Sequence, residues 1–221
     1  HLKEHAARPA LTVTSYPADA RNRIVELVFD YPAGKAELQE MQQDVAESLR
    51  AAEIYVRYCA NETEKAALLF TYLAERFPYE QGQTRTPVYS ALCQGIADSE
   101  SMAQSWQLLC DEAGLTCRTV SGMRGSESYW WNIMELDGVA CHVDILRDLL
   151  NHGTLRLRYD EDMVGEYYWD AAQLPACPSP VIEEEPAQPT EEQPEEPTDP
   201  AQDPDYQPEQ PTPEPDPDPE A

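Results

Sequence analysis

The stretch that decides the fold runs from Tyr89 to Asp144 and reads YSALCQGIADSESMAQSWQLLCDEAGLTCRTVSGMRGSESYWWNIMELDGVACHVD. Its first half places apolar residues every three or four positions and then reaches Gly114, which predicts an amphipathic helix over residues 98–113. Its second half is rich in β-branched and aromatic residues, and Asp137-Gly138 is typical of a tight hairpin turn. The expected strands cover residues 116–121, 129–136 and 139–146. A helix followed by an antiparallel meander therefore organises the chain.

The flanking sequence adds further elements to this core. A strand is expected over residues 23–31, a long helix over 36–59, and a third helix that begins after Asn61. Residues 155–159 alternate and suit a fourth strand, whereas residues 1–22 read as an extended lead-in. The fold class predicted for residues 23–177 is α+β, with helices packed on an antiparallel sheet.

The C-terminal part of the chain has the composition of a disordered tail. Residues 178–221 hold 15 of the 42 acidic residues and 14 of the 20 prolines, with almost nothing apolar to bury. The whole chain of 221 residues has a formal net charge of −27, which argues against binding to nucleic acid or to an anionic membrane surface. No apolar run approaches the roughly 20 residues of a membrane-spanning helix, so membrane insertion is not expected.

The N-terminal residue, the tail composition, and the spacing of cysteines and histidines bear on the protein's location and on metal binding. The chain begins at His1 rather than Met, and its Pro/Glu tail is a common spacer composition, so we expect an extracellular or surface-attached bacterial protein. The six cysteines form no CxxC pair, and we interpret them as small buried residues, although their even number also suits disulfides. His1, His5 and His152 have no ligand spacing, so neither a metal site nor a cofactor is predicted.

Short motifs in this order resemble the transglutaminase-like superfamily, whose members share the papain-type arrangement of Cys, His and Asp. The matching segments are Tyr89-Ser90-Ala91-Leu92, Gly95, Ala103, Ala113-Gly114-Leu115, Val120-Ser121-Gly122, Trp131-Asn132, Leu136-Asp137-Gly138 and His142-Val143-Asp144. The resemblance covers about residues 23–177 and implies a papain-like core. It also implies a nucleophile at the start of the helix, a base on the second strand and an orienting carboxylate on the third.

Two of these three positions carry the wrong residue for acyl transfer. The nucleophile position is Ser99 and the base position is Tyr129, and only Asp144 is retained. A hydroxyl is much harder to deprotonate than a thiol, and a phenol with a pKa near 10 is a poor base at neutral pH. These departures from the family pattern predict an inactive domain. In it, we expect the Tyr129 hydroxyl to form a hydrogen bond with Ser99 or Asp144.

A domain of this kind can act as a binding or structural module. Trp130, Trp131, Asn132 and His142 are the residues expected to line the former active-site groove, and a peptide, a protein or a cell-wall glycan-peptide is the expected ligand. Two alternatives stay open. The first is a weak hydrolase or acyl transferase that uses Ser99, or Cys93 six positions earlier, and it needs a base that the sequence does not reveal. The second is a passive scaffold whose tail reaches the partner.

Overall fold

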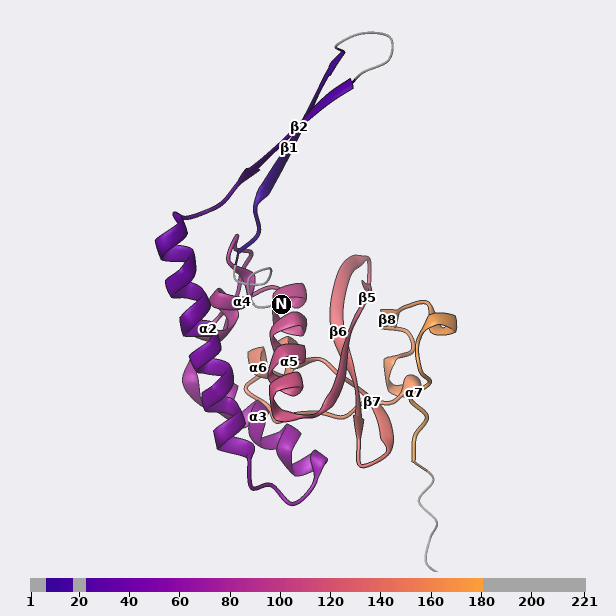
Figure 1. Ribbon diagram of the computed structural model, residues 1–221. Helices are drawn as coiled ribbons and strands as arrows, with labels where there is room; N and C mark the ends of the chain where they lie inside the picture. Colours follow the sequence, from indigo (N-terminus) through magenta and orange to yellow (C-terminus); the bar gives the residue numbers. More distant parts are fainter. Residues whose placement is uncertain (1–6, 18–22, 181–221) are drawn as a thin grey trace, which may run out of the picture. The chain divides into compact units, whose positions relative to one another are not determined.

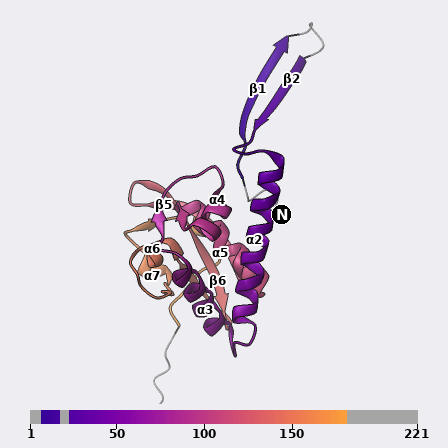
Figure 2. The same cartoon turned by 90° about the vertical axis from the view of Figure 1, so that its left-hand side faces the viewer.

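The computed structural model describes residues 7–17 and 23–180, and Figures 1 and 2 show it from two sides. Its core consists of helices α2 (Lys35–Val56), α3 (Glu62–Arg76) and α5 (Ser99–Ala113) with a four-stranded antiparallel sheet. This arrangement confirms the predicted α+β class. Of the expected tail over residues 178–221, residues 181–221 lie outside the described residues, as do residues 1–6 and 18–22 of the lead-in.

The first two strands form a hairpin that the sequence did not predict. Strand β1 (Ala10–Pro17) pairs antiparallel with β2 (Arg23–Asp30), with Ala10 opposite Asp30. The expected boundary between lead-in and domain, at residue 22, therefore falls inside one hairpin. Polar and proline residues in the first strand hid its pairing with the second, more apolar strand.

Helices α2 and α3 pack together and supply one side of the core. The apolar side of α2 buries Val45, Leu49, Ala52 and Val56. Helix α3 begins as predicted, because the Asn61 side chain accepts a hydrogen bond of 2.7 Å from the Glu64 amide. The Glu64 carboxylate in turn accepts from the Ala60 amide at 2.7 Å, one residue earlier than a standard capping box places it.

A compact turn leads from α3 to the central helix. It consists of β3 (Glu80–Gln81), α4 (Pro87–Tyr89), the π-helical turn η1 (Ser90–Gln94) and β4 (Ile96–Ala97). Strands β3 and β4 pair in parallel, with Gln81 beside Ala97. Gly95 joins η1 to β4 with a φ of 75°, a backbone conformation that glycine adopts without strain. This pairing fixes where the chain enters α5.

Helix α5 lies at the centre of the domain, and it contacts α2 as well as strands β5 and β6 (Figure 1). It buries Met102, Trp106, Leu109 and Cys110. The helix ends at Gly114, which has a φ of 73° and serves as the C-cap that the sequence predicts. Its N-cap is Asp98, so Ser99 is the first helical residue and not the cap.

The sheet has the strand order β7-β6-β5-β8. Its members are β5 (Thr116–Arg124), β6 (Glu127–Leu136), β7 (Val139–Val143) and β8 (Tyr167–Tyr168). The hairpin turn at Asp137-Gly138 is confirmed, with both residues at positive φ. Gly122 lets β8 approach, because a Cβ there would lie 2.3 Å from the Tyr168 carbonyl oxygen.

Two predictions about the sheet are wrong. Residues 155–159 form no regular strand, since only an isolated bridge joins Arg158 to His142. The third strand stops at Val143, and Asp144 caps the short helix α6 (Ile145–Leu150) instead of lying on the strand. The Asp144 carboxylate accepts a bond from the Arg147 amide, which is the reason the chain turns into a helix there.

The closing segment covers the face of the sheet away from α5. It contains α7 (Asp160–Met163), β8 and the 3₁₀ turn η2 (Ala171–Gln173). Its Met163, Tyr167 and Cys177 bury Val120, Trp131 and Ile133 of the sheet in a second apolar cluster. Within the described residues, no helix combines the length and apolar character needed to cross a membrane.

Candidate functional site

The nucleophile position lies at an acidic helix start. The Asp98 carboxylate accepts a bond of 2.8 Å from the Ser101 amide, and the Ser101 hydroxyl accepts one of 2.9 Å from the Asp98 amide. Glu100 follows in the same turn and forms an ion pair of 2.7 Å with Arg8. Ser99 therefore lies between two carboxylates, which oppose the formation of an anion even though the helix dipole favours it.

Asp144 is buried, with 1% of its surface exposed, and both oxygens of its carboxylate accept hydrogen bonds. One oxygen accepts hydrogen bonds from the Tyr129 hydroxyl and the Arg147 amide, both at 3.1 Å. The other accepts from the Tyr167 hydroxyl at 2.7 Å. Burial raises the pKa of Asp144, and these donors partly offset that shift. The carboxylate that orients a histidine in active relatives is thus held by two phenols.

Tyr129 occupies the base position and meets Asp144 as predicted. The alternative contact is not formed, since no hydrogen bond joins Ser99 to Tyr129 or Asp144 in the part of the chain that the structure describes. Burial, and then the neighbouring Asp144 charge, raise the pKa of Tyr129 well above its ordinary value. The phenol therefore stays protonated at neutral pH and donates to Asp144 rather than accepting a proton.

Two arginines surround this pair of tyrosines. The Arg124 guanidinium lies 5.3 Å from the Tyr129 ring centre and forms a 2.7 Å ion pair with Glu166. Arg147 bonds to the same Glu166 and to the Tyr167 hydroxyl, both at 3.0 Å. Burial opposes ionisation of Glu166, but the bonds from both arginines hold its pKa below the usual value. The tyrosines, arginines and Glu166 form a connected polar network around Asp144.

An open cleft of about 340 Å³ adjoins this network. Its lining residues are Gln81, Arg124, Glu127, Tyr129, Leu146, Arg147, Leu150 and Asn151. One lining residue, Gln81, pairs with Ala97, which precedes Ser99 by two residues. Another, Tyr129, is at the position that the resemblance assigns to the base. The cleft therefore borders the region where the superfamily resemblance places the active site.

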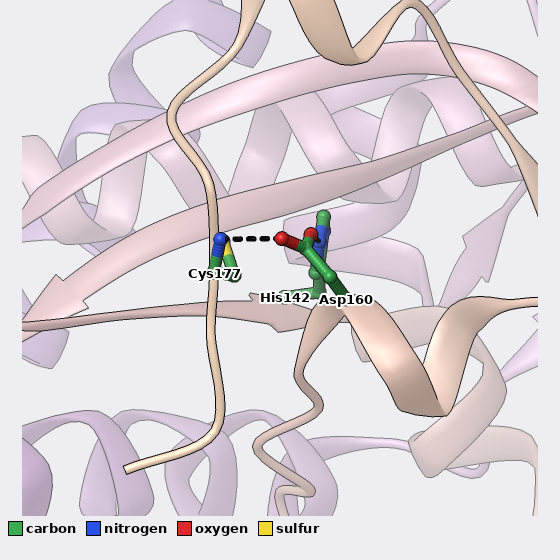
Figure 3. Close-up of side chains that lie close together, drawn as sticks. All are labelled: His142, Asp160 and Cys177. Carbon is green, nitrogen blue, oxygen red and sulfur yellow. Dashed lines mark hydrogen bonds and ion pairs between the residues drawn. The ribbon is translucent and has the colours of Figure 1, made fainter. Parts of the chain in front are cut away.

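Figure 3 shows a second cluster, in which the buried His142 and Cys177 meet the partly exposed Asp160. The Trp131 indole donates a bond of 3.0 Å to His142 Nδ1, and His142 Nε2 lies 3.0 Å from the Asp160 carboxylate. Because an indole N–H is only a donor, Nδ1 is unprotonated and Nε2 carries the proton that Asp160 accepts. The backbone amide of Cys177 donates to the other Asp160 oxygen at 2.9 Å.

This cluster has ligand types that suit zinc, but its hydrogen bonds do not fit a metal. Coordination through Nε2 would require an imidazolate, since Nδ1 already accepts from Trp131. Burial also raises the pKa of the Cys177 thiol to about 11 and lowers the pKa of His142. The cluster is a hydrogen-bonded connection between β7, α7 and the closing segment, in which a neutral imidazole and the Cys177 amide both donate to Asp160.

The residues expected to line the groove are mostly internal. Trp131, Asn132 and His142 are buried, with at most 1% of their surface exposed, and only Trp130 is partly exposed. Asn132 donates from its side chain to the Ala103 carbonyl at 2.9 Å and so attaches the sheet to α5. Trp131 packs against Tyr167 and Trp169. As placed, these three residues hold the fold together and have no access to a ligand in the cleft.

The alternative nucleophile and base have no supporting contact. Burial raises the pKa of the Cys93 thiol to about 11, which disfavours the thiolate. Both nitrogens of His142 are occupied by Trp131 and Asp160. Among residues 7–17 and 23–180, no histidine forms a hydrogen bond with Ser99 or Cys93.

Sequence reasoning missed Arg124, Arg147, Glu166 and Tyr167. The only available signal for Tyr167 was the aromatic run from Tyr167 to Trp169 near the end of the domain. The arginines gave none, because isolated basic residues in an acidic chain look like ordinary surface residues. Their shared partner, Glu166, lies 42 positions from Arg124.

Comparison with known proteins agrees with the resemblance. Residues 50–145 match the family described as the transglutaminase-like superfamily. No curated protein gives a significant match.

Solved structures that match the chain include a candidate protease from Parabacteroides distasonis, with 14% identity and a TM-score of 0.37. A candidate cysteine protease from Cytophaga hutchinsonii has 9% identity and a TM-score of 0.40, and a protein described as a TGase has 8% and 0.40. The matches cover 62%, 73% and 76% of this chain and 36%, 72% and 47% of those chains, respectively.

Proposed function

The chain belongs, through residues 50–145, to the transglutaminase-like superfamily, and on that premise we propose that it is a non-catalytic binding module. It holds a peptide or glycan-peptide in the cleft beside the former active site, at a bacterial cell surface. The observation that carries the proposal is the carboxylate of Asp144, whose two oxygens accept from Tyr129, Tyr167 and the Arg147 amide. Three of the roughly four acceptor sites of this carboxylate are therefore occupied by groups that are not a catalytic base.

The cleft favours a ligand that carries a carboxylate. Arg124 and Arg147 both line it. Arg124 bonds to Glu166, and Arg147 bonds to Glu166 and to the Tyr167 hydroxyl. A guanidinium has five N–H donors, so these contacts leave donors on both arginines for a ligand. Peptides and cell-wall stem peptides carry free carboxylates, which pair with arginine in a fork geometry. Leu146 and Leu150 add apolar contact on the α6 side.

Absence of catalysis is tested with the purified full chain and a glutamine-containing peptide. We expect neither release of ammonia nor incorporation of a fluorescent primary amine, because position 99 is a serine without a base. Iodoacetamide-sensitive turnover above the buffer rate would contradict the proposal.

Binding is tested by co-sedimentation with insoluble bacterial peptidoglycan. We expect the chain to sediment with it, and Arg147→Gln to reduce the bound fraction about tenfold, since a charge-assisted bond contributes roughly 1.5–3 kcal/mol. The matched control is Arg57→Gln, because Arg57 pairs with Glu53 at the C-terminal end of α2 and does not line the cleft. Equal binding by both variants, or no binding by the parent chain, would reject the cleft as the peptide site.

The surface location rests on composition. A chain with a net charge of −27 and a Pro/Glu segment suits a soluble domain displayed on a spacer. Protease treatment of intact producing cells should remove the domain if it is displayed outside.

A further inference from the structure

The β1–β2 hairpin presents an apolar face that no other described residue covers. The register places Leu11 opposite Phe29, Val13 opposite Leu27 and Ser15 opposite Val25 on this face. The five apolar members are between 53% and 57% exposed, and none of the six side chains is charged. We call this set of six residues the apolar hairpin face.

The opposite face of the same hairpin is different in character. It carries Thr12, Thr14 and Tyr16 on β1, and Ile24, Glu26, Val28 and Asp30 on β2. The Tyr16 hydroxyl donates to Glu26 at 3.1 Å, and Arg85 pairs with Asp30 at 3.1 Å. The opposite face therefore combines two acids with the exposed side chains of Ile24 and Val28, whereas the apolar hairpin face has no acid.

A two-stranded hairpin is marginally stable alone and requires packing of its apolar face. The chain's own tail is a poor cover, because residues 181–221 contain Val181, Ile182 and Tyr206 among dense prolines and acids. This face is therefore suited to burial by another polypeptide.

We propose that the apolar hairpin face is covered by the same face of a second copy, related by a two-fold axis. A charge-free patch is complementary to itself, which a two-fold interface requires. Two chains that each have a formal net charge of −27 repel one another. The apolar hairpin face has no acid, so contact through this face brings the fewest negative charges together. Full contact would bury roughly 1,000 Å² in total, the lower limit for a specific interface. The dimer is consequently weak and depends on concentration.

Sedimentation velocity of the full chain tests this proposal, from about 5 µM to about 500 µM, a range in which interfaces near this lower limit dissociate. We expect monomer at the low end and mostly dimer at the high end. Raising NaCl from about 0.02 M to about 0.5 M should increase the dimer fraction, because salt screens the repulsion between copies. A monomer at every concentration and salt level would overturn the proposal.

A matched pair of variants identifies the face. Leu27→Asp places a charge on the apolar hairpin face and should weaken association at least about tenfold. Val28→Asp changes the neighbouring residue on the opposite face and should leave association within about threefold. Methyl NMR provides an independent readout, since dilution should shift the signals of Leu11 and Leu27 and leave Val28 unchanged. Association that survives Leu27→Asp, or is lost equally in both variants, would overturn the assignment to this face.

Discussion

The domain holds two carboxylates in neighbouring hydrogen-bonded clusters, and their partners differ. Asp144, at the family position, accepts from Tyr129 and Tyr167, beside an open cleft. Asp160 accepts from His142, in the interior beside Cys177. The chain therefore has a Cys, a His and an Asp in close proximity, but in a place where the thiol is buried and the imidazole is fixed by Trp131.

The difference teaches that residue types alone do not make an acyl-transfer site. The cluster around His142 contains a thiol, an imidazole and a carboxylate, but its thiol is buried and its imidazole is held in a tautomer unsuited to acyl transfer. The cleft is open to a substrate but lacks the thiol and the imidazole. In both clusters each carboxylate oxygen accepts at least one hydrogen bond, and such networks stabilise a fold. The following experiments disturb one cluster while the other serves as the reference.

The largest effect is expected from emptying the interior cluster. His142→Ala should lower the free energy of unfolding by about 3 kcal/mol, because it leaves a cavity and deprives the Trp131 indole and Asp160 of their partner. Urea denaturation measures the change. His152→Asn is the control, since His152 is exposed with a φ of 49°, which asparagine tolerates. A loss below about 1 kcal/mol for His142→Ala would contradict the arrangement.

A pH titration of stability addresses the same cluster. The folded pKa of His142 is lowered by burial, although Asp160 opposes that shift, so below about pH 6.5 the unfolded chain binds a proton that the folded chain refuses. Stability should therefore fall as pH drops from the unfolded pKa toward the folded one. The groups that face the imidazole are Asp160 and Cys177, and Cys177 is neutral in this range.

His142→Asn isolates that contribution, since its side-chain oxygen can still accept from Trp131. The parent chain should lose more stability than this variant between about pH 7 and pH 5. Identical pH slopes would show that His142 does not titrate differently in the folded and unfolded chains.

A smaller effect is expected at the cleft. Tyr129→Phe removes one of the donors to Asp144 and should cost about 1 kcal/mol of stability, as measured by urea denaturation. Tyr168→Phe provides the control, because the Tyr168 hydroxyl bonds to the Gly165 carbonyl at an exposed site and its loss should change little. If Tyr129→Phe were neutral or stabilising, the contact with Asp144 would contribute nothing to holding the site.

The sequence predicted α5, strands β5 to β7 and their hairpin turn, since local periodicity and Asp137-Gly138 specify them. It also predicted, from strand order and family register, that the Tyr129 hydroxyl bonds to Ser99 or Asp144, and the second of these contacts is formed. It could not reveal the β1–β2 pairing or the partners Tyr167 and Glu166, because these depend on contacts between distant segments. Asp144 was placed on a strand because the alternation continues past Val143, whereas its side chain caps α6 instead.

We propose above all that position 99 is unreactive, because the residues around it stabilise the fold instead of activating a nucleophile. The most direct test is the alkylation rate of Ser99→Cys, resolved from the six native cysteines by peptide mass spectrometry. We predict that this thiol reacts no faster than free cysteine, since Asp98 and Glu100 flank it and no histidine bonds to position 99 among the described residues. Ser99→Cys with Tyr129→His serves as the positive control and should react faster, because Asp144 can orient the new imidazole. A single variant alkylated about tenfold faster than free cysteine would contradict the account.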